Sequence, residues 1–478
     1  MDLILGFGET GASFARYLKE RGRPFLIMDS RLNPPGLSQL KTKNSKDLIL
    51  GEFNTKFLTD IERVLVSPGI DLDNEVLMKA RNLEIPILTD IEVFMEQTKS
   101  KTILVTGTNG KTTVVSMAGH LLKKIYGEDK VVCCGNIGKP VLDTISLDNS
   151  ISIIELSSFH LELSEPFSSD IAVLLNVDQD HLDRHLSLEK YSQIKQRILM
   201  KTKRGLIGSK SINSTLLNEE NNYLYETLLK PFEKDVFSLI NQDWPFHELK
   251  NVKAVIAIYI AMEDLYGNLD MNSLGINNLN LIKKSVSHIN SFTRMQHRYE
   301  VLGTKKGVTF INDSKSTNLS SLEAALDSAK RQYGKRSVLL ICGGDSKRQD
   351  FSRISEKSLE SVKHLFAFGK DRQILMNELK NTRVFTYIGH KSDIWTLTVE
   401  EARQLCVPVV TFGIGSISDR VDNGFTGYIV KSEDEFASKV LNLMNDDALY
   451  LKLKKNMFEN RGKLNWESIA DEWIKKYL

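Results

Sequence analysis

Short apolar runs alternate with amphipathic stretches along the first ninety or so residues of the chain. Residues 3–8 (LILGFG), 24–29 (PFLIMD) and 63–70 (RVLVSPGI) have the length and composition of buried strands. Residues 12–22 (ASFARYLKERG) place apolar positions at helical spacing. Strand, helix and strand in succession are typical of a parallel α/β sheet. We therefore expect such a sheet at the start of the chain.

The same alternation recurs twice more. Four strand-like runs, a long apolar helix and then two further strand-like runs follow at residues 101–106, 129–134, 151–157, 171–177, 253–267, 307–314 and 337–344. The pattern changes again from about residue 381, where PVVTF is a further candidate strand. A chain of 478 residues also has room for about three domains. We predict three α/β units, at residues 1–95, 96–297 and 298–478.

Composition restricts the classes of partner. The chain has 63 basic and 61 acidic side chains, a net charge of +2, so nothing electrostatic favours nucleic acid. Its longest apolar run, residues 254–262, is too short to span a membrane, and no basic segment precedes the first apolar run as in a signal peptide. Four cysteines lack metal-ligand or disulfide spacing. We expect a cytoplasmic protein without nucleic-acid binding or membrane insertion.

A glycine loop follows the first predicted strand. Residues Gly6–Gly11 (GFGETG) fit G-x-G-x-x-G between a strand and a helix, and Asp29 ends the next strand. Such a loop binds phosphorylated nucleotides, including dinucleotides such as NAD, or merely makes a tight turn. The motif alone leaves these alternatives open.

A second loop, TGTNGKTT, is more specific. Glycine lets backbone N–H groups point at phosphate oxygens, the lysine supplies charge, and the threonine after it occupies the Mg²⁺-ligating position of a P-loop. The longer motif has a glycine where Val105 stands, so only the form G-x-x-G-K-T fits. We predict an ATP site at Gly107, Thr108, Asn109, Gly110, Lys111, Thr112 and Thr113.

Carboxylates end two strands near this loop. Glu155 ends one strand, and Asp178, Asp180, His181 and Asp183 follow another. Because carboxyl ends of parallel strands meet at one sheet edge, these groups are natural Mg²⁺ ligands. For the histidine, a structural role and a ligand role carry equal weight. Lys195, in a helical stretch, has the periodicity of an ordinary surface lysine.

Nine strings in order carry a resemblance: MDSR, SPGI, TGTNGKTT, GNIGKP, ELSSF, NVDQDHLDRH, QHRYE, INDSKSTN and GGDSK. From residue 1 to about 375 the chain resembles the Mur ligase family, and within it the members that add D-glutamate to UDP-N-acetylmuramoyl-L-alanine. The resemblance implies a Rossmann-like UDP-binding domain, a central P-loop ATPase domain and a Rossmann-like C-terminal domain. NAD is then not implied.

The resemblance also implies a reaction. ATP phosphorylates the substrate's carboxylate, and the amine of D-glutamate displaces phosphate from the acyl phosphate. ATP and two Mg²⁺ sites are implied, and we expect a monomer. The implied metal ligands are Thr112 and Glu155 for one ion, and His181 with a carbamylated Lys195 for the other. A lysine can react with CO₂ only as the neutral amine, which burial beside positive groups favours.

Further residues take roles by match to the family. The implied UDP-sugar contacts are Gly8, Thr10, Asp29, Arg31 and Ser67. Asn136 and Ser157 would line the rest of that substrate. Asn251 would contact adenine, and Arg298 and Asp313 would reach ATP. The implied amino-acid pocket consists of Lys315, Thr317 and Lys347.

The chain departs from the family in three places. His160 replaces the glutamine of ELSSFQ, and Glu248 replaces an asparagine before the adenine contact. The serine loop that holds the far carboxylate of D-glutamate is not found. Residues 381–478, after the Mur-like 298–380, instead resemble the end of a family-4 GT-B glycosyltransferase, with Glu400 and Glu401 as possible donor-site remnants. On the simplest interpretation the tail completes the third α/β layer, and Ser416 stands in for the missing serine.

Three hypotheses follow from these observations. The chain is a D-glutamate ligase with an unusual C-terminus, a ligase for another amino acid, or a fusion that binds nucleotides without turnover.

Overall fold

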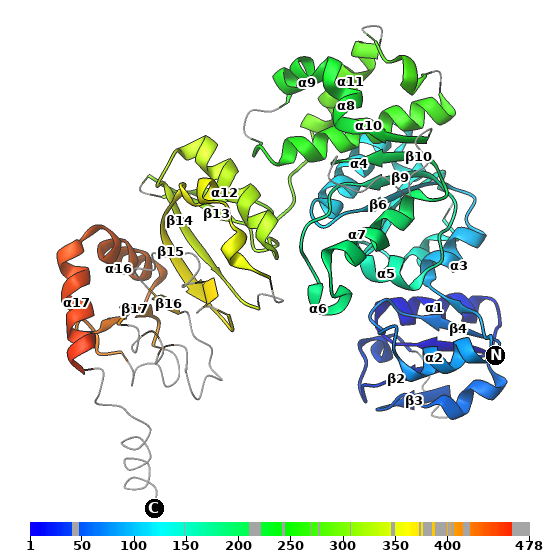
Figure 1. The fold of residues 1–478 in the computed structure, drawn as a ribbon, viewed down its shortest axis with the longest axis horizontal. Helices are drawn as coiled ribbons and strands as arrows, with labels where there is room; N and C mark the ends of the chain where they lie inside the picture. Colours follow the sequence, from blue (N-terminus) through cyan, green and yellow to red (C-terminus); the bar gives the residue numbers. More distant parts are fainter. Residues whose placement is uncertain are drawn as a thin grey trace, which may run out of the picture. The chain divides into compact units, whose positions relative to one another are not determined.

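The computed structural model describes residues 1–40, 47–147, 149–209, 221–240, 244–267, 269–275, 278–305, 307–345, 349–371, 374–375, 385–387, 399, 402, 406–413 and 421–460. The chain divides into two compact units, Met1–Asp313 and Ser314–Leu478. Figure 1 colours them from blue to green and from yellow to red. The fold is α/β with parallel sheets, as predicted, whereas the domain boundaries at residues 95 and 297 stay predictions.

The first sheet has five parallel strands in the order β3-β2-β1-β4-β5. Its elements are β1 (Asp2–Leu5), α1 (Glu9–Glu20), β2 (Phe25–Asp29), β3 (Leu48–Leu50), β4 (Arg63–Val66), α2 (Glu75–Asn82), β5 (Ile87–Leu88) and α3 (Asp90–Gln97). The strand order reverses at β1, so the glycine loop after β1 lies at the switch point where such sheets bind ligands.

Both faces of this sheet are buried, which explains its continuous apolar strands. Leu3 and Leu5 of β1 pack into one core cluster, and Ile4 between them packs into another with Phe14 and Leu18 of α1. Alternate side chains of a strand point to opposite faces. A strand covered on both sides is therefore apolar at most of its positions.

The second sheet has six parallel strands in the order β11-β10-β9-β6-β8-β7. The strands are β6 (Lys101–Thr106), β7 (Val131–Gly135), β8 (Ile151–Glu155), β9 (Ser169–Leu174), β10 (Thr202–Ile207) and β11 (Asn222–Leu224). Because β6 lies between β8 and β9, the segments that leave the carboxyl ends of these three strands are neighbours. They carry the P-loop, Glu155 and the Asp178–Asp183 stretch.

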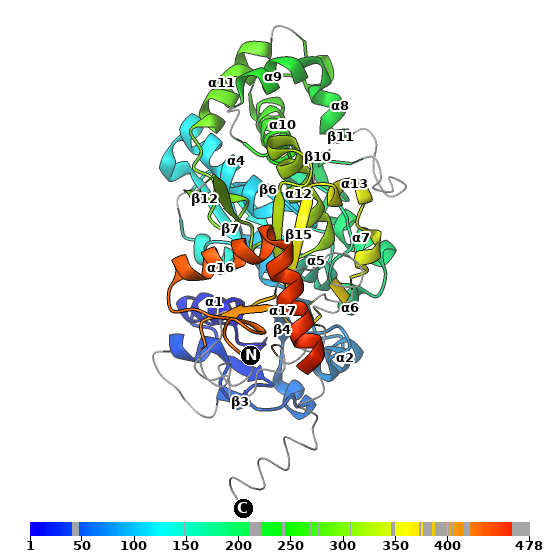
Figure 2. The ribbon, with the colours of Figure 1, turned by 90° about the vertical axis from the view of Figure 1, so that its left-hand side faces the viewer.

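Helices cover this sheet. They are α4 (Lys111–Tyr126), α5 (Ser158–Leu163), α6 (Leu182–His185), α7 (Leu188–Gln196), α8 (Tyr225–Leu229), α9 (Glu233–Leu239), α10 (Glu248–Tyr266) and α11 (Leu279–Asn290). Figures 1 and 2 show α8 to α11 gathered at one end of the unit. The long α10 is buried along most of its length, and its apolar residues join those of α4 in one core cluster. The predicted apolar helix is thus confirmed.

The two sheets are packed into one unit. One core cluster contains Phe14 and Leu18 from α1 together with Val141 and Leu142 from the central sheet's connections. Arg16 adds a two-pronged ion pair to Asp143, through Nε at 3.0 Å and Nη2 at 2.6 Å. A glycine loop and a P-loop are thereby carried by one packed body.

The rest of the chain forms smaller sheets. The first unit ends in the antiparallel pair β12 (Glu300–Lys305) and β13 (Val308–Asn312). The second unit holds two parallel sheets with helices, made of α12 (Leu319–Tyr333), β14 (Val338–Gly343), α13 (Glu356–Leu359), β15 (Val362–Phe368), β16 (Phe385–Tyr387), β17 (Val409–Thr411), β18 (Gly427–Ile429), α16 (Glu433–Asn445) and α17 (Asp447–Asn460). The predicted strand in PVVTF is β17. Across the described ranges, no helix is both long and apolar enough for a membrane span.

Candidate active site

The P-loop connects β6 to α4, which begins at Lys111. Gly110 has a φ of +85°, in the left-handed region that favours glycine. A Cβ at this position would lie 2.6 Å from Oδ1 of Asn251. Glycine is therefore required at 110 by conformation and by space. The same contact places Asn251, the predicted adenine contact on α10, directly against the loop.

The segment after β9 holds the loop in shape. Asn109 donates its backbone N–H to Oδ1 of Asn176 at 2.8 Å, and Asn176 Nδ2 donates back to the Asn109 carbonyl at 3.0 Å. Thr108 Oγ1 accepts the Asp178 N–H at 2.9 Å. Asn176 was not among the predicted site residues. Its position directly after a buried strand, beside the P-loop strand, is the signal that could have identified it.

Lys111 lies over the loop that precedes it. Its Nζ donates to the carbonyl of Gly107 at 2.7 Å and to that of Thr108 at 2.9 Å. Lys111 also borders a small cavity, which is lined by Lys111, Ser157, Ser158, Phe159, Asp180, His181, Tyr191 and Lys195. Three predicted catalytic residues, Lys111, His181 and Lys195, therefore share one cavity.

Lys195 is almost fully buried, with 1% of its surface exposed. Its Nζ donates to the Gly107 carbonyl at 3.0 Å and to Thr106 Oγ1 at 3.3 Å, and it lies over the Tyr191 ring. Burial, reinforced by the charge of Lys111, lowers the pKa of Lys195 well below its usual range. The prediction of a surface lysine from helical periodicity was wrong, because the Lys195 side chain points inward from α7 to the P-loop.

Glu155 has the arrangement expected of a Mg²⁺ ligand. It is 1% exposed, and its Oε1 accepts from Asn136 Nδ2 at 2.9 Å. Its Oε2 is buried and has no hydrogen-bond partner among the described residues. A bare buried carboxylate oxygen is costly unless something pairs with it. The described residues contain no group of three His, Cys, Asp or Glu side chains suited to a metal.

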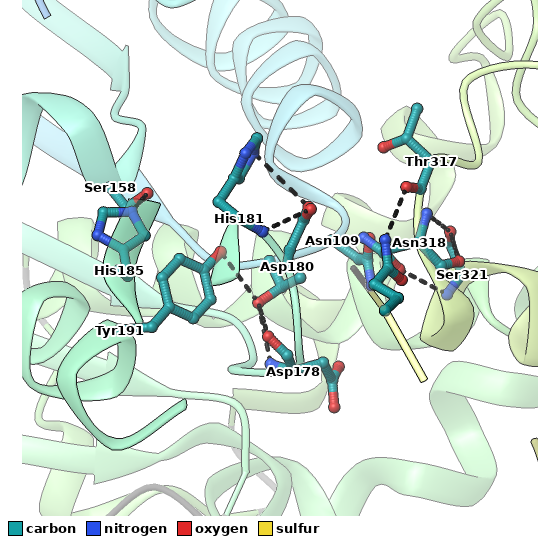
Figure 3. Close-up of polar contacts among 12 residues, drawn as sticks. Asn109, Ser158, Asp178, Asp180, His181, His185, Tyr191, Thr317, Asn318 and Ser321 are labelled. Atoms are coloured by element: carbon teal, nitrogen blue, oxygen red, sulfur yellow. Dashed lines mark hydrogen bonds and ion pairs between the residues drawn. The ribbon is translucent and has the colours of Figure 1, made fainter. Parts of the chain in front are cut away.

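His181 lies in the segment after β9, and Figure 3 shows it beside Asp180. Its backbone is left-handed, with φ of +51°, and its N–H donates to Asp180 Oδ1 at 3.0 Å. Its ring packs edge-on against Phe159, with centroids 5.0 Å apart. Tyr191, the other ring of the cavity, is within 3.4 Å of Thr108 Oγ1 through its hydroxyl. The histidine is thus held at the cavity by its own backbone and by Phe159.

Ser157 connects the cavity to a buried histidine. Its hydroxyl caps α5 and lies 2.7 Å from Nδ1 of His160. His160 Nε2 is 4.0 Å from Oδ1 of Asp90, and both side chains are buried. Burial lowers the pKa of His160 to about 4 and raises that of Asp90 to about 7. The histidine that replaces the family's glutamine is therefore a neutral support for Ser157.

The glycine loop after β1 is closed by Asp29. This buried carboxylate accepts the Phe7 N–H at 2.7 Å and the Arg31 guanidinium at 2.7 and 2.8 Å. Burial alone would raise the pKa of Asp29, but the hydrogen bonds of Arg31 and Phe7 leave it lowered. Asp29 is therefore held as a carboxylate at the end of β2.

The same loop is supported from β4 and is open at its middle glycine. Ser67 Oγ donates to the Gly6 carbonyl at 2.7 Å. At Gly8 no atom lies within 4 Å of where a Cβ would stand. The predicted UDP-sugar contacts at or after the carboxyl ends of β1, β2 and β4 thus lie together at one loop.

Arg298 and Asp313 lie at the end of the first unit. Asp313 Oδ1 accepts the Tyr299 N–H at 2.9 Å, and the Tyr299 ring contacts His247 at the start of α10. Burial raises the pKa of Asp313 to about 6 against the opposing effect of Arg298. These predicted ATP contacts thus belong to the same unit as the P-loop.

The predicted amino-acid pocket falls in the second unit. Lys315 and Thr317 lie there, just before α12. Lys347, Glu400, Glu401 and Ser416 lie outside the described residues. The pocket therefore stays a prediction.

Three family models match successive parts of the chain. The model described as "Mur ligase MurD-like, N-terminal domain" matches residues 1–89, and "Mur ligase middle domain" matches residues 105–257. The model described as "Glycosyl transferases group 1" matches residues 294–460. The predicted glycosyltransferase likeness of the tail is confirmed, and this match begins further upstream than residue 381.

Alignments of this chain with curated relatives cover most of the length of those relatives. The UDP-N-acetylmuramoylalanine–D-glutamate ligase of Shewanella oneidensis is 32% identical over 374 residues, which cover 77% of this chain and 83% of that protein. The ligase of the same name from Coxiella burnetii (strain Dugway 5J108-111) is 32% identical over 418 residues, covering 84% and 91%. Among solved structures, the UDP-N-acetylmuramate-alanine ligase of Thermotoga maritima is 16% identical with a TM-score of 0.47, covering 92% and 99%.

Proposed function

Because this chain belongs to the Mur ligase family, we propose that it is an ATP-dependent ligase of peptidoglycan precursor synthesis. It joins the amine of D-glutamate to the carboxyl group of UDP-N-acetylmuramoyl-L-alanine. The observation that carries the proposal is the meeting of Lys111, Lys195 and Ser157 at one cavity, with the bare oxygen of Glu155 at the end of the neighbouring strand.

The reaction has two steps. A carboxylate oxygen of the substrate attacks the γ-phosphorus of ATP, and the bond to the ADP oxygen breaks. The amine of D-glutamate then attacks the acyl carbon, the carbon–oxygen bond to phosphate breaks, and the amine loses a proton. Two anions must meet in the first step, so positive charge between them lowers the barrier. Lys111, which is already held over the loop carbonyls, supplies it.

The proposal assigns two Mg²⁺ ions. Thr112 and Glu155 would hold one on the phosphates, and His181 with a carbamylated Lys195 would hold the other. Bound Mg²⁺ neutralises phosphate charge and polarises the transferred group. The lowered pKa of Lys195 supports its part, since only a neutral amine reacts with CO₂. The Oε2 atom of Glu155, which has no hydrogen-bond partner within the described part of the chain, supports the role of Glu155 at the other ion.

The UDP-sugar substrate takes the first sheet's loop. Gly8 and Thr10 would contact the pyrophosphate, with Asp29, Arg31 and Ser67 on the uracil side. The open space at Gly8 and its place at the switch point of the sheet support this assignment. Asn136 and Ser157 would line the muramoyl-alanine end, next to Glu155 and the cavity respectively.

The ATP and amino-acid contacts complete the proposal. Asn251 would contact adenine, and its position against Gly110 supports that role. Arg298 and Asp313 would reach ATP. Lys315, Thr317 and Lys347 would bind D-glutamate. The C-terminal part of the chain matches a glycosyltransferase family model. The identity of the amino-acid substrate is therefore tested with a panel of amines.

We also propose a cytoplasmic monomer. The four cysteines, all of them free thiols, support a reducing compartment.

The proposal predicts amide formation coupled to phosphate release. Purified chain is incubated with UDP-N-acetylmuramoyl-L-alanine, ATP, Mg²⁺ and, in parallel, D-glutamate, L-glutamate, L-alanine, glycine or L-lysine. Amide product is measured by mass spectrometry and phosphate by colour assay, with Lys111→Met as the inactive control. We expect both products with D-glutamate. If product forms only with another amine, that amine replaces D-glutamate in the proposal. Absence of product with every amine would refute the proposal.

A further inference from the structure

Arg184, a residue without an assigned role so far, joins the two sheets of the first unit beside the cavity. It lies on α6, immediately after the segment that carries Asp180 and His181. We infer that Arg184 is a positioning residue, which fixes the substrate-binding loop of the first sheet relative to the phosphoryl-transfer cavity. This inference rests on the proposed function.

The guanidinium of Arg184 contacts both sides. Its Nε donates to Glu162 Oε2 on α5 at 2.8 Å. Its Nη2 donates to the carbonyl of Ile70 at 2.9 Å, and Nη1 is 3.4 Å from Asp71 Oδ1. Ile70 and Asp71 follow β4 of the first sheet. Arginine suits this role because its planar fork donates in several fixed directions at once.

On the first-sheet side, Arg184 reaches the glycine loop through Ile70 and Ser67. The Ile70 N–H donates to the Ser67 carbonyl at 3.1 Å, and Ser67 Oγ donates to the carbonyl of Gly6 at 2.7 Å. A Cβ at Gly6 would lie 3.1 Å from Ile70 Cδ1. The residue that Arg184 grips is therefore packed against the loop proposed to bind the pyrophosphate.

On the cavity side, Arg184 supports two of the residues that line it. The guanidinium lies 4.4 Å from the centre of the Phe159 ring, which packs against His181. The next residue, His185, lies 2.9 Å from Ser158 Oγ through Nε2 and 3.3 Å from Glu162 Oε1 through Nδ1. Figure 3 shows the His185–Ser158 pair beside Tyr191. One carboxylate, Glu162, thus holds Arg184 and His185 together.

This connection bears on the reaction because the reacting carboxylate is at one end of a long substrate. The other end is held by the glycine loop, so the reacting distance depends on the placement of that loop relative to Lys111. A misplacement of about 1 Å can cost on the order of 100-fold in rate. Loss of Arg184 should therefore lower kcat while each nucleotide still binds.

The chain offers a matched control. Arg16 also joins the two sheets, through its ion pair with Asp143, but neither residue lines the cavity or is among the proposed ligand contacts. Methionine keeps the aliphatic length of arginine without its charge. Arg184→Met and Arg16→Met therefore each remove one ion pair between the sheets, and only the first lies at the site.

The experiment compares full-length wild type, Arg184→Met, Arg184→Lys and Arg16→Met. Tm, kcat, the KM for ATP and the Kd for UDP-N-acetylmuramoyl-L-alanine are measured for each. We expect kcat to fall at least about tenfold in Arg184→Met, with a smaller loss in Arg184→Lys, while the ATP KM stays within about twofold. Arg16→Met should lower Tm by a similar amount and keep kcat within about twofold.

Two results would overturn the inference alone. One is a wild-type kcat in Arg184→Met, and the other is an equal loss of kcat in Arg16→Met, which would make the effect one of stability. An inactive wild type would instead refute the proposed function, and the positioning role with it.

Discussion

The protonation state of the buried Lys195 amine is central to the chemistry of the site. A buried lysine must lose its proton or find an anionic partner, because a charged group is costly away from water. Here the neighbouring charge of Lys111 adds to the cost of a second ammonium. In the proposed carbamate, the neutral amine would have reacted with CO₂ and would carry a negative charge instead.

The first prediction concerns that amine. Lys195→Arg keeps a positive charge that cannot be carbamylated, so we expect kcat to fall by at least about 10–100-fold. Wild-type activity should decline in CO₂-depleted buffer and return when bicarbonate is added. Steady-state rates in the two buffers measure this. Equal rates in the two buffers for the wild type would argue against the carbamate.

The second prediction concerns the pH dependence of stability through Asp90. Its pKa is raised to about 7, so between about pH 4 and 7 the folded chain holds a proton that the unfolded chain has lost. The contribution of Asp90 to stability is therefore greatest in acid and is lost as the pH rises through 7. Asp90→Asn removes this effect. The Tm of the variant minus the Tm of the wild type should therefore increase by several degrees between pH 4 and pH 7.

His160 provides the opposite slope. Its pKa is lowered to about 4, so the unfolded chain binds the extra proton between pH 4 and about 6.5, and stability falls as the pH drops through that range. His160→Gln, which restores the family's residue, should lessen this acid loss. Thermal melts of both variants across pH 4–8 measure the two slopes. Parallel curves for wild type and variants would contradict the assigned shifts.

At the scale of elements, both nucleotide loops depend on where their strands lie in the sheet. Each loop follows the strand at which the order of its sheet reverses or divides, β1 or β6, and each has glycine where a side chain would obstruct it. The P-loop is tightly packed at Gly110, whereas the glycine loop is open at Gly8. Equivalent substitutions in the two loops should therefore have different effects on stability.

The third prediction compares Gly110→Ala with Gly8→Ala. At 110 alanine must adopt a left-handed backbone and meet Asn251, so we expect a cost of about 1–3 kcal/mol in the free energy of unfolding and a raised KM for ATP. At 8 there is space and an ordinary φ of −87°. Tm should therefore be unchanged there, while the KM for the UDP substrate rises. Denaturation curves and initial rates separate the two, and equal stability losses would contradict the difference in packing.

The apolar runs predicted most strands of both parallel sheets, because buried strands are apolar at most of their positions. β3, β5, β10 and β11 were not predicted. β3, β5 and β11 have only two or three residues and no clear pattern, and β10 begins with the polar residues Thr202, Lys203 and Arg204. The P-loop was predictable because its residues are adjacent in sequence. Asn176 and the burial of Lys195 were not, because both depend on how segments far apart in the chain meet.

At the scale of the whole molecule, the first unit contains both proposed nucleotide sites. Its two sheets share a core cluster and are joined by the ion pairs Arg16–Asp143 and Arg184–Asp71. Arg298 and Asp313 also belong to it. The proposed amino-acid pocket is in the second unit.

The fourth prediction follows from this division. A fragment of residues 1–313 should melt cooperatively and bind ATP and UDP-N-acetylmuramoyl-L-alanine, but form no amide with D-glutamate. Differential scanning calorimetry and nucleotide titrations test it against the full chain. A fragment that is unfolded, or that turns over like the full chain, would show that the division is incorrect.

The C-terminal part was the hardest to predict. Its strands β16, β17 and β18 have three residues each, and the nine Mur-like strings end before them. Strands β16, β17 and β18 pair in parallel in a sheet of their own, separate from the sheet of β14 and β15, so completion of the third α/β layer by the tail stays a prediction. The residues that choose the amino acid cannot be assigned from pattern alone, because a pocket is a property of side-chain geometry.

The central claim is that a carboxylate receives the γ-phosphoryl group of ATP in the cavity of Lys111. The most direct measurement uses UDP-N-acetylmuramoyl-L-alanine labelled with ¹⁸O in its carboxylate, with ATP, Mg²⁺ and D-glutamate, and mass spectrometry of the released phosphate. We expect one ¹⁸O atom in each phosphate released with amide. Amide formation with unlabelled phosphate would contradict the claim.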